Sequence, residues 1–202
     1  MRSLEKAVFF ILIFGIVGCG GSREKEIQRI LDSPVDYDSN LSPWANMQDY
    51  TTWAWVPMPK AVDIDPRASD PKLREAIENA VGQQMKVRGY VRSATTPDLY
   101  VNYQLAEQKI DEQYIEKMYN GSYWPNYRMD FQGSGKARKE WDQGTLLVFV
   151  FDAKSQSMVW QGSATAEITD EAPEQKSLER LNTVIKTLFT SLPGKPSWQS
   201  NP

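Results

Sequence analysis

The sequence of 202 residues contains no histidine. Histidine is the base of the Ser-His-Asp and Cys-His nucleophile systems, and it is also the commonest protein ligand of zinc. Its absence removes both nucleophile systems and that zinc ligand from the candidate chemistries.

Cysteine is almost as scarce, because Cys19 is the only one in the chain. A single cysteine cannot form an internal disulfide, so the stability of the fold has to come from its apolar core.

Basic runs and phosphate-binding glycine loops are also missing. The formal net charge is −3, and no stretch of the chain has the cluster of basic residues that nucleic-acid binding requires. The segment 133–136 (GSGK) lacks the spacing of a Walker loop. The sequence therefore predicts neither a nucleic-acid partner nor a cofactor, and it shows no internal repeat.

The N-terminal segment has the pattern of a secretory signal peptide. Arg2 and Lys6 precede the apolar run 7–17, which is too short to span a bilayer as a mature helix. Residues 16–19 (IVGC) resemble the lipobox of bacterial lipoproteins. The resemblance implies removal of residues 1–18, a diacylglycerol on the sulfur of Cys19, and an acyl group such as palmitate on its amino group. An ordinary secretory signal followed by a chance cysteine is the alternative.

The residue after Cys19 bears on the destination of such a lipoprotein. In enterobacteria an aspartate there favours retention in the inner membrane, and this chain has Gly20 instead. We therefore expect an outer-membrane protein that faces the periplasm. Residues 19–33 are polar and predict a tether containing a helical turn or two, and loss of the signal moves the formal charge from −3 to −4.

A β-hairpin near the C-terminus organises the remaining chain. Its first limb, Leu146–Phe151, is apolar at every position, as in a central strand that is covered on both faces. Its second limb alternates from Met158 to Ile168, which places Met158 and Trp160 on one face. Three further strands are predicted at 35–38, 50–56 and 99–106, and the tryptophans Trp53, Trp55 and Trp160 are assigned to the core.

Two amphipathic helices accompany these strands. Asp70 is the predicted N-cap of the first helix, which Gly89 ends, and the second carries an apolar stripe from Leu178 to Leu192 and stops before Pro193. The sequence therefore predicts a single α+β domain over residues 34–193. Its sheet is mostly antiparallel, with about five strands and two amphipathic helices packed on it, and residues 194–202 form a flexible tail.

With these residues in view, the chain resembles the bacterial lipoprotein family labelled domain of unknown function 4136. The resemblance rests on the order and spacing of VDYD, YTTWAW, RGY at 88–90, PDLYVNY, the hairpin GTLLVFVFDAKSQSMVWQGSA and the closing helix. It covers roughly residues 35–193 and implies a fold and a place in the cell envelope, with no catalytic residue to carry over.

The segment 111–143 is the candidate binding site, because it is rich in aromatic side chains. Within residues 114–131 the candidate contacts to a partner protein or a glycan are Tyr119, Tyr123, Trp124 and Tyr127. Flat aromatic faces suit sugar rings and protein hot spots. The favoured interpretation of the segment is an extended hairpin that turns at residues 120–121 and folds its aromatic side chains onto the sheet face that the helices leave bare.

Carboxylates supply the only candidate catalytic or metal groups. The acids flanking the aromatic segment are the best candidates for a glycoside hydrolase pair, namely Glu107, Asp111, Glu112, Glu116 and Asp142. Asp36, Asp38 and Asn40 have the opening spacing of a calcium loop, but Leu41 and Met47 stand where such a loop needs glycine and glutamate, so a strand ending in an Asx turn is favoured. Asp63, Asp65 and Asp70 lie in a proline-rich loop and form a further candidate cluster.

Three functions therefore remain open. The favoured one is a non-catalytic, lipid-anchored envelope protein that binds a partner or assists an assembly. The others are a glycan-binding module that uses residues 114–131, and a carboxylate-dependent hydrolase.

Overall fold

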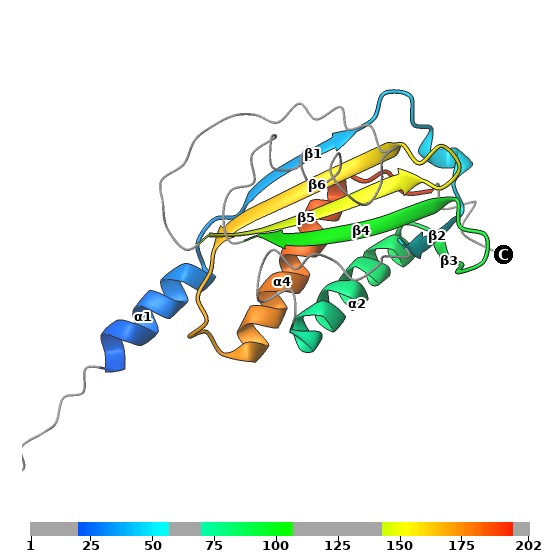
Figure 1. Ribbon diagram of the computed structural model, residues 1–202. Helices are drawn as coiled ribbons and strands as arrows, with labels where there is room; N and C mark the ends of the chain where they lie inside the picture. Colours follow the sequence, from blue (N-terminus) through cyan, green and yellow to red (C-terminus); the bar gives the residue numbers. More distant parts are fainter. Residues whose placement is uncertain (1–19, 57–69, 107–142, 196–202) are drawn as a thin grey trace, which may run out of the picture.

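The fold is an open, mixed β-sheet of six strands with two helices packed on one face (Figure 1). The structure is a computed structural model that describes residues 20–56, 70–106 and 143–195. The strands are β1 (Asp36–Leu41), β2 (Thr52–Trp55), β3 (Val91–Arg92), β4 (Leu99–Ala106), β5 (Gln143–Asp152) and β6 (Met158–Glu167). Their spatial order is β1-β6-β5-β4-β2-β3, so the predicted hairpin limbs β5 and β6 occupy the middle of the sheet.

The apolar limb β5 is a central strand, as its sequence predicts. It pairs antiparallel with β4 on one side and with β6 on the other. Its side chains from Leu146 to Phe151 are all at most 5% exposed. Leu146, Val148 and Val150 belong to the main core, while Phe149 and Phe151 stack on each other with ring centroids 6.2 Å apart.

The sheet is mostly antiparallel, as predicted, and its parallel pairings all involve β2. β2 pairs in parallel with both β4 and the short strand β3. A helix separates β2 from β4 in the chain, and a helical crossover is the usual way to make two neighbouring strands parallel. The two-residue strand β3 was not predicted, because two residues carry no periodicity.

The predicted facing of Met158 is wrong. Between Val150 and Phe151 the pairing with β6 shifts, so that Val150 lies opposite Trp160 but Phe151 lies opposite Met158. This irregularity leaves Val159 as an extra residue, and alternation cannot be counted through such a point. Met158 therefore shares a face with Phe151, while Trp160 keeps its place in the core at 1% exposure.

The two predicted helices are α2 (Pro71–Val87) and α4 (Glu174–Leu188), followed by the 3₁₀ turn η3 (Phe189–Ser191). Asp70 caps α2, since its carboxylate accepts a 2.9 Å hydrogen bond from the Lys72 amide. Gly89 follows the end of α2 with a φ of +85°, a conformation that glycine adopts without strain. The 3₁₀ turn η1 (Met47–Asp49) adds Met47 to the core.

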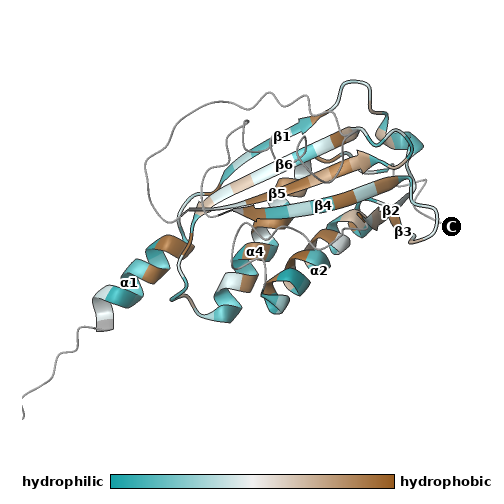
Figure 2. Cartoon of the chain, viewed as in Figure 1, coloured by the Kyte–Doolittle hydropathy of each residue, from teal (hydrophilic) through white to brown (hydrophobic). Residues whose placement is uncertain are grey.

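The N-terminal helix α1 (Gly20–Leu31) is longer than the helical turn or two expected in the tether. Figure 2 shows that α1 is largely hydrophilic, with apolar residues near the end that meets the domain. Among the described residues, no helix combines the length and the apolar character that crossing a membrane requires.

Candidate functional site

A pocket of about 490 Å³ opens at one end of the sheet, beneath the first turns of α2 and α4. Its floor is formed by the end of β6 and the start of β5, its walls by both helices, and one side by the last residues of α1. The apolar side chains that line it include Leu73, Leu105, Leu146, Ile168, Leu178 and Leu181. Ligand pockets in proteins commonly have volumes of about 300–1,000 Å³, so this hollow has the size of a binding site.

The exposure of the α4 stripe shows where the core stops. Ile185 and Leu188, in the second half of the helix, are at most 2% exposed. Leu178, Leu181 and Val184, which precede them on the helix, are only half-buried and line the pocket. The apolar stripe predicted from the sequence therefore runs past the packed core and into the hollow.

Small side chains in the sheet make room for the pocket. Ala164 and Ala166 on β6 project methyl groups at a place where larger residues would fill the space. Gly144, which lies opposite Ala166 in the β5–β6 ladder, is closely packed, because a Cβ there would lie 3.0 Å from the Ile168 side chain. The strands thus leave space beside Ala166, which is half-buried, while Ala164 at the inner edge of the pocket is buried at 3% exposure.

The pocket rim is charged. Lys72 at the start of α2 forms an ion pair of 3.1 Å with Glu174 at the start of α4. Asp70 and Asp170 also line the rim, and the carboxylate of Asp70 accepts a hydrogen bond from the Lys72 amide. Among the described residues that line the pocket, acidic side chains therefore outnumber basic ones.

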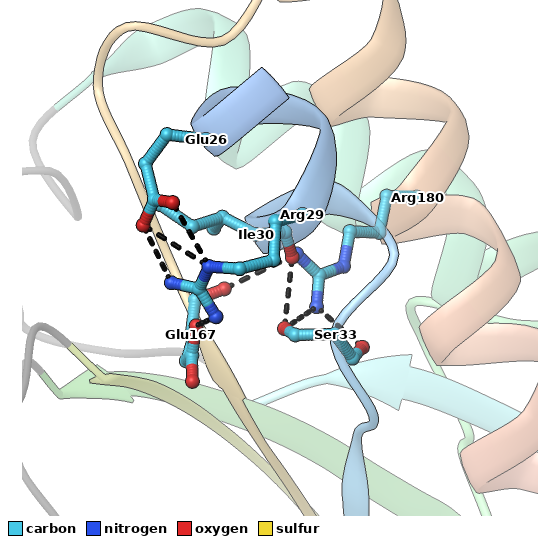
Figure 3. Close-up of polar contacts among 6 residues, drawn as sticks. All are labelled: Glu26, Arg29, Ile30, Ser33, Glu167 and Arg180. Atoms are coloured by element: carbon cyan, nitrogen blue, oxygen red, sulfur yellow. Dashed lines mark hydrogen bonds and ion pairs between the residues drawn. The ribbon is translucent and has the colours of Figure 1, made fainter. Parts of the chain in front are cut away.

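Arg180 of α4 connects the pocket to the N-terminal helix (Figure 3). Its guanidinium donates hydrogen bonds to the carbonyls of Ile30, Ser33 (3.1 Å) and Glu167 (3.2 Å), and to the Ser33 hydroxyl at 3.0 Å. Burial lowers the pKa of Arg180 from its usual value, against the opposing charge of Glu167. One side chain thus joins α4, the end of β6 and the segment that leads from α1 into β1.

Exposed polar contacts complete the docking of α1. Arg29 pairs with Glu167 at 2.8 Å and with Glu26 of its own helix at the same distance, as Figure 3 shows. Further towards the N-terminus, Arg23 pairs with Glu171 at 2.6 Å. Such exposed pairs contribute little to stability, but together with Arg180 they define how α1 lies against the domain.

Most of the predicted site residues lie outside the described residues. These are Cys19, the aromatic candidates Tyr119, Tyr123, Trp124 and Tyr127, and the carboxylates Glu107, Asp111, Glu112, Glu116, Asp142, Asp63 and Asp65. The ends of the intervening segment are nevertheless placed. β4 and β5 are antiparallel neighbours, with Ala106 opposite Thr145, so the segment leaves and re-enters the sheet beside the pocket.

The remaining candidates, Asp36, Asp38, Asn40 and Asp70, have structural roles in the part of the chain that the structure describes. Asp36, Asp38 and Asn40 all lie in β1, which continues to Leu41, so the Asx turn expected at the strand end is not there. Asp70 serves as a helix cap. No group of three or more acidic, cysteine or histidine side chains suited to a metal ion is found among the described residues.

The pocket and Arg180 were not predicted from the sequence. Alternation placed Ala164 and Ala166 correctly on the helix-facing side of β6, but it could not show that a hollow remains beside Ala166. The run of half-buried leucines on α4 looks the same in sequence whether it meets a packed core or a hollow.

Comparison with known proteins identifies the family. The sequence model described as "Domain of unknown function (DUF4136)" matches residues 35–194. The chain belongs to this family. The match begins at Val35, so α1 precedes the DUF4136 domain and docks onto it from outside.

Within the DUF4136 domain, the RGY motif joins the end of α2 to the C-terminal segment. Arg88 donates a 3.1 Å hydrogen bond to the Leu192 carbonyl and lies over the Phe189 ring. The Tyr90 hydroxyl donates to the Pro193 carbonyl at 2.8 Å. The Lys195 amide donates to the Arg88 carbonyl, so ordered contacts extend two residues beyond the domain limit predicted from sequence.

Several solved structures resemble this DUF4136 chain. A DUF4136 family protein from Bacteroides thetaiotaomicron is 17% identical with a TM-score of 0.49, and the match covers 76% of this chain and 95% of that one. A PelC dodecamer from Paraburkholderia phytofirmans is 11% identical with a TM-score of 0.46, covering 81% of this chain and 100% of that one. A PDZ domain protein from Parabacteroides distasonis is 12% identical with a TM-score of 0.45, covering 79% of this chain. The match spans only 36% of the PDZ protein, and no curated protein matches the chain.

Proposed function

We propose that this DUF4136 protein is a lipid-anchored component of the bacterial cell envelope that works without catalysis. In this account Cys19 carries the lipid, the protein faces the periplasm from the outer membrane, and the domain binds a partner or assists an assembly. The observation that carries the proposal is that α1 begins at Gly20, directly after Cys19, and is docked onto the domain through Arg180.

The docking of α1 supports a defined placement of the domain relative to its anchor. The helix has 12 residues and is therefore about 18 Å long at a rise of 1.5 Å per residue. A docked helix holds the domain within that distance of Cys19, whereas a flexible tether would let it rotate freely. A fixed orientation suits a protein that presents one surface to a partner in the envelope.

The anchoring is tested by fractionating cells that express the full chain or its Cys19→Ser variant. The account predicts that the wild-type chain sediments with outer-membrane vesicles and that Cys19→Ser loses this association. The variant Ser22→Ala, which leaves Cys19 intact, serves as the matched control and should behave as the wild type does. Equal fractionation of the wild-type chain and Cys19→Ser would reject lipid anchoring.

The binding role is tested by photo-crosslinking in intact cells with the probe at Trp124. Ser155 is the control position, because it is exposed in the turn between β5 and β6. A discrete adduct to one envelope protein from position 124 alone supports a protein partner. Retention of the protein on purified cell-wall glycan, lost on substituting Tyr123 and Trp124 by alanine, would support the glycan-binding alternative instead.

A further inference from the structure

We infer that the pocket between α1, α2, α4 and the sheet binds one long acyl chain of a membrane lipid whose head group carries an ammonium group. This inference rests on the proposed function in one respect, because anchoring through Cys19 is what would bring the pocket to a membrane. The pocket itself, its lining and its charged rim are properties of the described residues.

The size of the pocket suits an acyl chain. At roughly 30 Å³ for each water-sized group, a volume of about 490 Å³ holds about 16 groups, which is the length class of a common membrane acyl chain. A single hydrocarbon chain therefore fits within the pocket.

The lining suits hydrocarbon along its length. Leu73 from α2, Leu181 and Val184 from α4, and Leu105 from β4 all face the hollow and are half-buried. All four also pack against the main core, but they stay half-buried, whereas Ile77 on α2 and Ile185 on α4 are 0% exposed. An acyl chain would cover the apolar surface of these side chains that the core leaves exposed.

The polar groups of the pocket gather near the starts of α2 and α4. Lys72 is paired with Glu174, and the Arg180 guanidinium is committed to the carbonyls of Ile30, Ser33 and Glu167. Among the described residues of the rim, Asp70 and Asp170 leave an excess of negative charge. A carboxylate or an anionic head group would be repelled there, whereas an ammonium group would be attracted.

The position of the pocket makes lipid the favoured occupant over a soluble ligand. Ile30 and Leu31, at the end of α1, line the pocket, and the start of the same helix follows Cys19. The pocket therefore lies within the length of one short helix of the proposed anchor. An acyl chain could enter from the bilayer in which Cys19 is held.

The test maps where a lipid probe contacts the full-length protein purified from membranes and reconstituted in bilayers. The probe is lysophosphatidylethanolamine with a diazirine at the end of its acyl chain, and labelled peptides are identified by mass spectrometry. Labelling is expected in the peptides that contain residues 144–146, 164–168 and 178–184. Labelling that is spread over the surface with no enrichment in these peptides would overturn the inference.

Two variants and a matched control sharpen the result. Ala166→Phe fills the pocket, and Ala166→Leu fills it partly, so labelling of the pocket peptides should fall at least fivefold in the first and less in the second. Ala153→Phe makes the same change in the turn at the other end of the β5–β6 hairpin and should leave labelling unchanged. If Ala166→Phe fails to fold, the labelled peptides of the wild-type protein and of Ala166→Leu still decide whether the pocket binds the acyl chain.

The head-group preference is tested with three probes that share one acyl chain. The zwitterionic ammonium lipid should label the pocket more strongly than lysophosphatidylglycerol or the free fatty acid, and Asp170→Lys should reduce that preference. Equal labelling by all three probes, or a preference for the fatty acid, would overturn the ammonium assignment. The mass of the N-terminal peptide from the same preparation reports lipidation of Cys19, so a failure of anchoring is seen separately from a failure of the pocket to bind.

Discussion

Arg180 of α4 donates a hydrogen bond to the backbone carbonyl of Ile30, a residue 150 positions away in the sequence. The same guanidinium also reaches the carbonyls of Ser33 and Glu167. Three segments that meet only in the folded chain therefore depend on one side chain.

Replacing Arg180 by alanine should loosen this junction. Hydrogen bonds to charged groups are worth about 1.5–3 kcal/mol, and several carbonyls would lose their donor, so we expect a loss of about 2–3 kcal/mol. Thermal unfolding should occur roughly 5–10 °C lower, with faster amide exchange in Ser33 and β1. Arg180→Lys should restore little, because an ammonium group cannot match the planar fork of donors.

The control for this prediction is Lys176→Ala. Lys176 also links α4 to α1, but through a single exposed contact to the Gln28 side chain at 3.0 Å. Its removal should leave the melting temperature unchanged within error. Equal melting temperatures for Arg180→Ala and Lys176→Ala would contradict a special role for Arg180.

Trp160 and Gly162 form a matched pair in the core. The Trp160 ring packs against Phe189 with centroids 5.3 Å apart and extends over Gly162, where a Cβ would lie 2.6 Å from the ring. Trp160→Ala should destabilise the domain by about 3–5 kcal/mol through the cavity it leaves. Gly162→Ala should cost about 1–3 kcal/mol through overpacking.

Denaturant unfolding measures both effects. Trp44→Ala is the control, since Trp44 is 54% exposed. Its replacement should change the free energy of unfolding by no more than the experimental error. A Trp160→Ala variant as stable as Trp44→Ala would mean that the assigned facing of β6 is incorrect.

Asp98 should make stability depend on acid pH. Burial alone would raise the pKa of its carboxyl, but hydrogen bonds from the Thr51 and Thr52 amides (2.7 and 2.8 Å) and the Thr52 hydroxyl outweigh it and hold the pKa below its usual value. The resulting stability is present above the unfolded-state pKa and is lost as the pH falls through the folded-state pKa. Asp98→Asn should lower stability at pH 7 by about 1–2 kcal/mol and weaken its decline below pH 4.

Unfolding measured from pH 2 to pH 7 checks this prediction. Asp38→Asn is the matched control, because Asp38 is exposed on the edge strand β1. The idea fails if Asp98→Asn keeps the full acid dependence of the wild type.

Tyr90 should act in the opposite direction, at alkaline pH. Burial raises the pKa of its hydroxyl to about 12, although the nearby Arg88 charge lowers it in part. The stabilisation is complete below the unfolded-state pKa of about 10 and is lost as the pH rises towards 12. Tyr90→Phe should lose about 1 kcal/mol at neutral pH, from the bond to the Pro193 carbonyl, and show a smaller decline between pH 10 and 12.

Guanidinium titrations at pH 8 and pH 11 measure this difference. Tyr100→Phe is the matched control, because it removes the same hydroxyl group from a residue of β4 that lies outside the RGY motif. A decline in Tyr90→Phe equal to that in the wild type would assign the alkaline effect to other groups.

The sequence carried enough information for the main elements of the fold. The apolar run of β5 and the alternation of β4 and β6 are local patterns. Both helices are predicted from the spacing of their apolar residues, and α2 also from its N-cap Asp70. The family resemblance read from the order of these motifs is confirmed by the match over residues 35–194.

The features that sequence did not predict depend on relations between distant segments. The shift that turns Met158 away from Trp160 is a property of the β5–β6 ladder, not of either strand. The pocket depends on the separation between Ala166 and the first turns of α2 and α4. Arg180 donates hydrogen bonds to backbone carbonyls, and because every residue has a carbonyl, the sequence does not show which ones it will contact. The predicted aromatic contacts at Tyr119, Tyr123, Trp124 and Tyr127 lie outside the described residues and stay predictions.

The central claim is tested most directly by the mass of the N-terminal peptide of the protein isolated from its native membranes. The account predicts a chain that begins at Cys19 and carries a diacylglycerol on the sulfur and an acyl group on the amino nitrogen. A mature chain that begins elsewhere, or a Cys19 with a free thiol, would contradict lipid anchoring and remove the proposed source of lipid for the pocket.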